Sequence, residues 1–294
     1  MLYKTTLGTT IVKAKYLFLL LSLTISGADG APEESDLFLV ARDLSYGDID
    51  QQKLDVYYRT GPARLPVVIY VHGGGWGFGS KEDVYYKPHH FDEQNVAFIS
   101  MDYPLRWDYE IYDQAEDILS VIKWVKDNAA TYGLNEKKIV LMGHAAGAHL
   151  VSLFGTNESY LKAGGRQLSD ISAVISIDSG SCDIERLMVE LGSFIERRQH
   201  RLIFGNEQQY WHEASPASHV EANKGIPSFA LLYVADDEES VLQAKGFAKV
   251  LSQAGVENVM IPGNEKTSDS IDEQLGSPGD KTTQALMAFL RAKI

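Results

Sequence analysis

Apolar runs alternate along the chain with segments of helical periodicity. The runs long enough for buried strands are 66–71, 95–101, 138–142, 171–177 and 228–234. Shorter strands are predicted near 41–43, 53–58 and 259–261. Between residues 111 and 125, apolar side chains recur every three or four positions, which predicts an amphipathic helix. Further helices are predicted at 146–154, 239–254 and 282–292.

This alternation predicts an α/β fold, in which a mostly parallel central sheet is flanked by helices and connected by right-handed crossovers. The segment 182–222 breaks the alternation, so we expect it to form a small partial cap over the strand ends. No linker rich in proline, glycine or serine divides the chain. Residues 29–294 are therefore expected to form a single domain.

The first 28 residues have the pattern of a signal peptide. Three lysines precede an apolar run at 16–25, and the small residues at 26–28 fit a cleavage site. The run is too short to span a bilayer comfortably, so no stable membrane insertion is expected after cleavage. The expected location is secreted or periplasmic.

Charge and cysteine content narrow the range of partners. The formal net charge is −13, with 27 basic and 40 acidic residues, which argues against nucleic acid and anionic membrane surfaces. Cys182 is the only cysteine, so an internal disulfide and a multi-cysteine metal site are excluded. His89 and His90 are adjacent and there is no HExxH motif. We expect neither a metal nor a cofactor. The oligomeric state is not indicated.

The most informative segment is Gly143-His144-Ala145-Ala146-Gly147, directly after a predicted strand. It has the form of the Gly-x-Ser-x-Gly nucleophile elbow, a sharp strand-to-helix turn, with alanine in place of serine. The methyl group of Ala145 cannot attack a carbonyl.

A second glycine-rich segment, 72–76, reads His-Gly-Gly-Gly-Trp and follows the strand at 66–71. Such a segment forms either an ordinary turn or the loop whose backbone N–H groups bind the oxyanion of acyl transfer. Its place ahead of the elbow favours the second interpretation.

These motifs resemble those of HGGG-type carboxylesterases of the α/β-hydrolase superfamily, close to the feruloyl/acetyl-esterase and kynurenine-formamidase-like branch. The resemblance covers nearly all of the chain after the signal peptide. It rests on the two glycine motifs and on the segments 54–57, 79–81, 214–219 and 275–280. It implies that Gly73, Gly74 and the amide of Ala146 form the oxyanion hole.

The resemblance also implies where the other triad members belong, in the order Ser, Asp, His. Asp236 holds the acid position, with Asp237 as the alternative. Ser268, in the loop after the last strand, stands where the family has histidine. No histidine occurs after Asp236, so the general base is missing as well as the nucleophile.

Three hypotheses follow from the double loss. The first is a pseudoenzyme that keeps a pocket for a small ester or acyl ligand. The second is an altered or engineered form of a serine carboxylesterase whose parent hydrolysed esters through a Ser-His-Asp triad. The third is an active hydrolase that uses an unorthodox set of residues.

Overall fold

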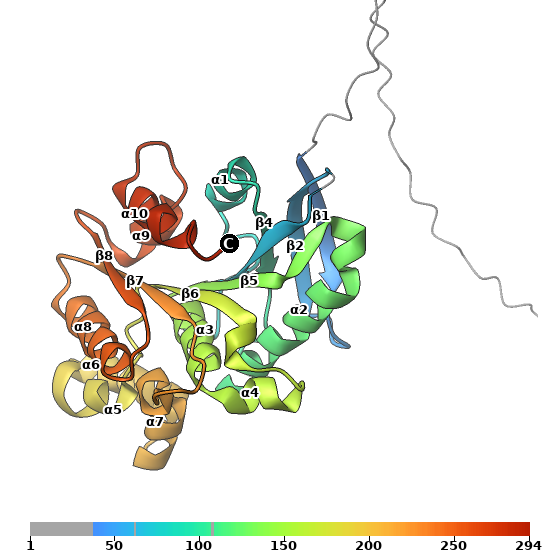
Figure 1. The fold of residues 1–294 in the computed structure, drawn as a ribbon. Helices are drawn as coiled ribbons and strands as arrows, with labels where there is room; N and C mark the ends of the chain where they lie inside the picture. The colour runs from blue at the N-terminus through green and yellow to red at the C-terminus, as the bar shows by residue number, and fades with distance from the viewer. Residues whose placement is uncertain (1–37, 62, 107–108) are drawn as a thin grey trace, which may run out of the picture. The chain divides into compact units, whose positions relative to one another are not determined.

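An eight-stranded sheet organises the computed structural model, which describes residues 38–61, 63–106 and 109–294 (Figure 1). The strands are β1 (Phe38–Ser45), β2 (Lys53–Arg59), β3 (Leu65–Val71), β4 (Ala97–Met101), β5 (Leu134–His144), β6 (Ile171–Ile177), β7 (Ser228–Val234) and β8 (Asn258–Gly263). Their order in the sheet is β1-β2-β4-β3-β5-β6-β7-β8. The β1–β2 and β2–β4 pairs are antiparallel, and all others are parallel. The predicted mostly parallel α/β fold is confirmed.

Helices cover both faces of this sheet (Figure 1). One face packs against α1 (Lys87–Glu93), α9 (Ser268–Glu273) and α10 (Lys281–Leu290), and the other against α2 (Ile111–Tyr132), α3 (Ala146–Thr156) and α8 (Glu238–Gln253). Successive side chains of a strand point to opposite faces. In β3, Ile69 therefore joins the core beneath α2 and α3, while Val68 joins the core beneath α1 and α10.

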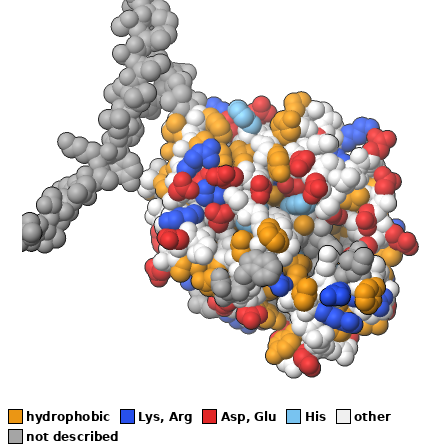
Figure 2. Space-filling model, turned by 180° about the vertical axis from the view of Figure 1, so that it is seen from behind, with side chains coloured by type: hydrophobic (Ala, Val, Ile, Leu, Met, Phe, Trp, Pro, Cys, Tyr) orange, Lys and Arg blue, Asp and Glu red, His pale blue; other side chains and the backbone are white. Residues whose placement is uncertain are grey.

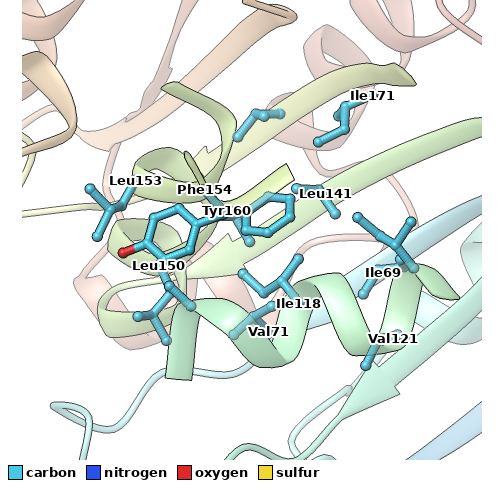
Figure 3. Packing of buried hydrophobic residues seen from close by; sticks show 14 of the residues in the cluster. Ile69, Val71, Ile118, Val121, Leu141, Leu150, Leu153, Phe154, Tyr160 and Ile171 are labelled. Carbon is cyan, nitrogen blue, oxygen red and sulfur yellow. The ribbon is translucent and has the colours of Figure 1, made fainter. Parts of the chain in front are cut away.

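Figure 3 shows the first of these cores, where side chains from β3 and β5 meet side chains from α2 and α3. Ile69, Ile118 and Phe154 are fully buried there. Burial of a large aliphatic or aromatic side chain contributes about 1.5–3 kcal/mol. The core thus anchors the first turn of α3, which carries the elbow, against the carboxyl end of β3.

The segment between β6 and β7 forms the cap, as its broken periodicity predicted. It contains α5 (Ile184–Arg186), the π-helical turn η2 (Leu187–Leu191), α6 (Phe194–Phe204), α7 (Gln208–Ala214) and the 3₁₀ turn η3 (Pro216–His219). Two further short helices, α4 (Glu158–Ala163) and η1 (Leu168–Asp170), precede β6. The Phe204 ring packs edge-on against Trp76, with ring centroids 5.2 Å apart. The cap therefore contacts the glycine loop after β3.

Acidic side chains are spread across the face of the molecule shown in Figure 2, as the net charge of −13 suggests. Among the described residues, no helix combines the length and the apolarity that a bilayer crossing requires. The predicted signal peptide, residues 1–28, lies outside the described residues.

Candidate active site

The nucleophile elbow keeps its backbone geometry although its serine is absent. Ala145, between β5 and α3, has φ 47° and ψ −108°. A non-glycine residue at positive φ costs on the order of 1–2 kcal/mol, so the surrounding structure must hold it there. One such restraint is the hydrogen bond from the Ala145 amide to the carbonyl of Ile177, at 2.9 Å. The turn therefore presents a methyl group where a nucleophile would stand.

Both glycines of the elbow are required by close approach of backbone to backbone. A Cβ on Gly147 would lie 2.0 Å from the carbonyl oxygen of Val71 in β3. A Cβ on Gly143 would lie 2.3 Å from the carbonyl oxygen of Gly147. Neither contact can be relieved by a side-chain rotation. The two glycines that shape the turn are therefore present, while the residue between them at position 145 is alanine.

The glycine loop after β3 lies against this turn. A Cβ on Gly73 would stand 3.5 Å from the Ala145 Cβ, and Gly74 has φ +114°, a conformation that glycine adopts readily. The loop is held from behind by the Tyr103 hydroxyl, which donates to the carbonyl of His72 at 3.0 Å. Within the described part of the chain, no acceptor receives a hydrogen bond from the amides of Gly74 or Ala146. These N–H groups are therefore available to a ligand oxygen.

Ser268 lies beside the elbow. The ring nitrogen Nε2 of His144 is 2.9 Å from the carbonyl oxygen of Ser268, a distance at which the imidazole donates. The sequence predicted a loop here, whereas Ser268 is the first residue of α9, because the Thr267 side chain caps the amide of Ser270. The Ser268 side chain is exposed. The structure thus places Ser268 against His144, the residue before Ala145, although β6 and β7 separate β5 from β8 in the sheet.

Asp236 and Asp237 follow β7 and have different partners. The Asp236 carboxylate accepts a hydrogen bond from the amide of Glu265 at 3.3 Å, in the segment that leads to Ser268. Asp237 caps α8 by accepting from the amide of Ser240 at 2.9 Å. This geometry favours Asp236 for the acid position, which stays a prediction.

Beneath the elbow, His149 forms a fully buried hydrogen-bond chain. Its Nδ1 accepts from the Trp76 indole N–H at 3.2 Å, and its Nε2 donates to the carbonyl of Ala214 at 2.8 Å. Because an indole only donates and a carbonyl only accepts, this arrangement requires neutral imidazole. Burial lowers the pKa of His149 to about 4. These hydrogen bonds connect the glycine loop to the cap through His149 of α3.

We expect His149 to make the fold sensitive to acid. Its pKa is about 4 when folded and near 6.5 when unfolded, so the unfolded chain takes up the proton first as the pH falls. Protonation of His149 in the unfolded chain should therefore lower the free energy of unfolding by about 3 kcal/mol as the pH falls from 6.5 to 4. Urea unfolding at several pH values measures this decrease.

The matched variant is His149→Gln, whose amide can accept from Trp76 and donate to Ala214 without taking up a proton. It should lose less stability on acidification than the unaltered protein. His89→Gln, at an exposed histidine, serves as the control for the substitution itself. Equal acid sensitivity in the unaltered protein and in His149→Gln would contradict the assignment.

Cys182, the single cysteine of the chain, carries a thiol that could in principle act as a nucleophile. It is buried, and its thiol lies 3.8 Å from the carbonyl of Ser179. Burial raises the pKa of this thiol to about 12. Since the thiolate is the reactive form, Cys182 is unsuited to attack a carbonyl at neutral pH.

One contact near the site could not be read from the sequence. The hydroxyl of Ser181, in the loop after β6, is 3.0 Å from Nε2 of His200 on α6. The His200 ring in turn lies edge-on to Trp76, with centroids 6.1 Å apart. No spacing signal links Ser181 to His200, because they come from a loop and from a cap helix that only tertiary packing brings together.

Residues 54–251 match the BD-FAE family, a range that contains the glycine loop, the elbow and Asp236. The chain belongs to the BD-FAE family. It is thereby an α/β hydrolase of the carboxylesterase-like kind, as the motifs implied.

Curated relatives of this BD-FAE member include esterases. A probable isoprenylcysteine alpha-carbonyl methylesterase from Oryza sativa subsp. japonica is 27% identical over 269 residues, which are 86% of this chain and 64% of the relative. Esterase LipC from Mycobacterium tuberculosis is 29% identical over 270 residues, or 85% of this chain and 64% of LipC. The chain thus spans slightly less than two thirds of the length of these two relatives.

Solved structures share the fold. Esterase B from Lactobacillus rhamnosis superposes with a TM-score of 0.71 at 20% identity, covering 87% of this chain and 84% of that one. Esterase 2 from Thermogutta terrifontis, in a structure with butyrate bound, has a TM-score of 0.67 at 21% identity, covering 88% and 94%. At this level of identity the likeness concerns the fold alone.

Proposed function

We propose that this protein binds a small ester or acyl ligand at the elbow and does not hydrolyse it through a serine acyl-enzyme. The observation that carries the proposal is the strained backbone of Ala145, retained beside unoccupied amide donors on Gly74 and Ala146. Such strain is held only where surrounding structure over-determines it, and it clusters at functional sites. The scaffold for carbonyl binding is present, and the reacting groups are absent.

The chemistry of the parent reaction explains why turnover is not expected. A serine nucleophile needs a hydroxyl to attack and a histidine to accept its proton. Ala145 has no hydroxyl at the nucleophile position, and Ser268 has no imidazole at the position of the base. Loss of a triad costs about 10⁶-fold in turnover, whereas the oxyanion hole and binding alone retain about 10³–10⁴ over water. Ala145 and Ser268 also agree with the second hypothesis, in which a serine carboxylesterase parent has been altered at these two positions.

Two alanine substitutions in one loop test the ligand site. In Gly73→Ala the new Cβ would stand 2.8 Å from the His144 imidazole and close to Ala145, so it would fill the space for a carbonyl group. In Gly75→Ala the new Cβ meets nothing within 4 Å. We expect Gly73→Ala to weaken binding of methyl butyrate about tenfold, or about 1.4 kcal/mol, with Gly75→Ala nearly unchanged.

Ligand-observed NMR titration with methyl butyrate measures both affinities, and the ester signals report whether hydrolysis occurs. Gly75→Ala also tests whether backbone strain in the loop weakens binding by itself. Alanine at the Gly75 φ of +58° carries a conformational cost that alanine at position 73 does not. Equal affinities in the two variants, or no binding by the unaltered protein, would overturn the proposed site.

The Ser181–His200 pair favours a second candidate, an active hydrolase with other residues. In that reaction the Ser181 hydroxyl would attack the ester carbonyl carbon and pass its proton to His200, which would return it to the departing alcohol. Water would then release the acid from the acyl-serine. Ser181 is only 3% exposed, which disfavours attack on a ligand in the absence of cap movement. Turnover by the unaltered protein that disappears in Ser181→Ala would establish this candidate.

A further inference from the structure

The cap helix α6 is attached to the rest of the molecule along one of its sides. On that side His200 lies 3.0 Å from the Ser181 hydroxyl, and the buried Phe204 ring packs edge-on against Trp76. The carbonyl at position 202 accepts a hydrogen bond from the Arg106 guanidinium at 2.9 Å. These contacts fix the position of α6 and leave its other side facing outward.

The outward side of α6 presents a single stripe of side chains. Phe194, Arg198, Arg201 and Leu202 stand at positions i, i+4, i+7 and i+8, which span about 100° around a helix of 3.6 residues per turn. Phe194 is 79% exposed and Leu202 is 70% exposed, the largest values for any big hydrophobic side chain in the described part of the chain. The two arginines are exposed as well. We call these four residues the α6 stripe.

The charge of the α6 stripe is opposite to that of the whole molecule. Residues 194–204 contain three arginines and one glutamate, in a chain with a net charge of −13. The arginine ion pairs among the described side chains belong to positions 42, 59, 64 and 186, so Arg198 and Arg201 are not among them. Figure 2 shows basic and hydrophobic side chains together on the lobe at its lower right, where the cap protrudes. The stripe therefore combines exposed apolar groups with positive charge that is open to an anionic partner.

The form of the α6 stripe favours a lipid surface over a folded protein as that partner. Phe194 and Leu202 are eight positions apart, or about 12 Å along the helix, and the arginines stand between them. The core of a stable protein interface is a contiguous apolar patch from which charged residues are depleted. A lipid surface needs no such patch, because headgroups and acyl chains rearrange around single apolar and basic side chains.

The net charge of −13 argues against anionic membranes for the molecule as a whole, but salt limits the distance over which charge acts. At an ionic strength of about 0.1 M, interactions between exposed charges are screened beyond about 10 Å. Acidic side chains on the other faces of the molecule therefore repel a membrane only weakly. Arginines in contact with the headgroups keep most of their attraction.

We propose that the α6 stripe docks this protein on the surface of a membrane rich in anionic phospholipid. The guanidinium groups of Arg198 and Arg201 would bind phosphate oxygens, for which their planar fork of donors is suited. Phe194 and Leu202 would enter the layer between headgroups and acyl chains. The helix would lie in the plane of the surface, since its 11 residues are too few to cross a bilayer. The proposal does not depend on the ligand proposed at Ala145.

Vesicle flotation tests the docking. Residues 29–294 contain all eight strands and both cores, and their use avoids attachment through the apolar run at 16–25. At about 0.1 M salt, we expect this chain to float with vesicles of phosphatidylcholine and phosphatidylglycerol in equal parts. Binding to vesicles of phosphatidylcholine alone should be at least about tenfold weaker, because each arginine near an anionic surface contributes about fivefold in affinity.

Two double variants with the same change in net charge locate the docking surface. Arg198→Gln with Arg201→Gln should weaken binding to the mixed vesicles about 30-fold. The control is Lys123→Gln with Lys126→Gln, which removes an exposed pair of the same spacing from α2 and should leave binding nearly unchanged. All four side chains are exposed, so neither double variant should lower the melting temperature.

The apolar part of the stripe is tested by Leu202→Ser. This change should weaken binding to the mixed vesicles about tenfold, because the leucine side chain no longer enters the lipid. The proposal is overturned by absence of binding to the mixed vesicles, by equal binding to phosphatidylcholine alone, or by equal effects of the two double variants. Self-association in solution that Leu202→Ser abolishes, without any vesicle binding, would assign the stripe to a second copy of this chain instead.

Discussion

Changing Ala145→Ser and Ser268→His together is expected to produce the ester hydrolysis that we propose the unaltered protein lacks. The elbow backbone already has the required conformation, and Ser268 lies within one hydrogen bond of the elbow residue His144. We expect p-nitrophenyl acetate turnover in the double variant to exceed that of the unaltered protein by at least about 10³-fold. Each single change should add little, since nucleophile and base act as a unit.

Asp236, which we place at the acid position of the triad, provides the control for this experiment. Adding Asp236→Ala to the double variant should remove most of the gain and return turnover close to that of the unaltered protein, because the histidine then loses its orienting partner. Adding Asp237→Ala should affect stability through the α8 cap, by about 1 kcal/mol, more than it affects turnover. A double variant as inactive as the unaltered protein would show that the pocket itself has changed, or that the histidine belongs elsewhere than at 268.

Lys87→Met is expected to be the most destabilising single substitution considered for this protein, at about 3–5 kcal/mol. The Lys87 ammonium is fully buried, 2.9 Å from Asp272, whose carboxylate also accepts from the Tyr70 hydroxyl at 2.9 Å. Burial lowers the pKa of Lys87, and the Asp272 charge opposes this shift. Removal of the lysine would leave a buried carboxylate without its counter-ion.

Urea unfolding at neutral pH measures that loss. The matched control is Lys162→Met, which breaks a largely exposed ion pair with Glu158 and should cost less than about 1 kcal/mol. Combining Lys87→Met with Asp272→Asn should recover part of the stability, because no unpaired charge then remains buried. A cost for Lys87→Met as small as that for Lys162→Met would contradict the interpretation.

Strand and helix content could be predicted where the signal was periodic. The run at 66–71 became β3, because a strand that is buried on both faces has a continuous series of apolar residues. The stripe at 111–125 became part of α2, because a helix that is buried on one face has apolar residues every three or four positions. The short helices α1 and α9 were not predicted. Each has fewer than two turns, and α9 depends on the Thr267 cap rather than on an apolar stripe.

The candidate site was predicted in its parts but not in its geometry. Gly73, Gly74 and Ala145 could be named from motifs, since close backbone approach demands glycine and nucleophilic attack demands a hydroxyl. The choice between Asp236 and Asp237 depended on hydrogen bonds to Glu265 and to α8. Those bonds join segments whose proximity no local pattern encodes.

By itself, the sequence determined the α/β class and the presence of alanine at position 145 and of serine at position 268, because periodicity and functional groups are properties of residues taken in order. Only the tertiary structure decided that Ala145 still occupies a strained turn and that Lys87 meets Asp272 inside the core. These features depend on distances between residues remote in the chain, and such distances are set by packing of the whole domain.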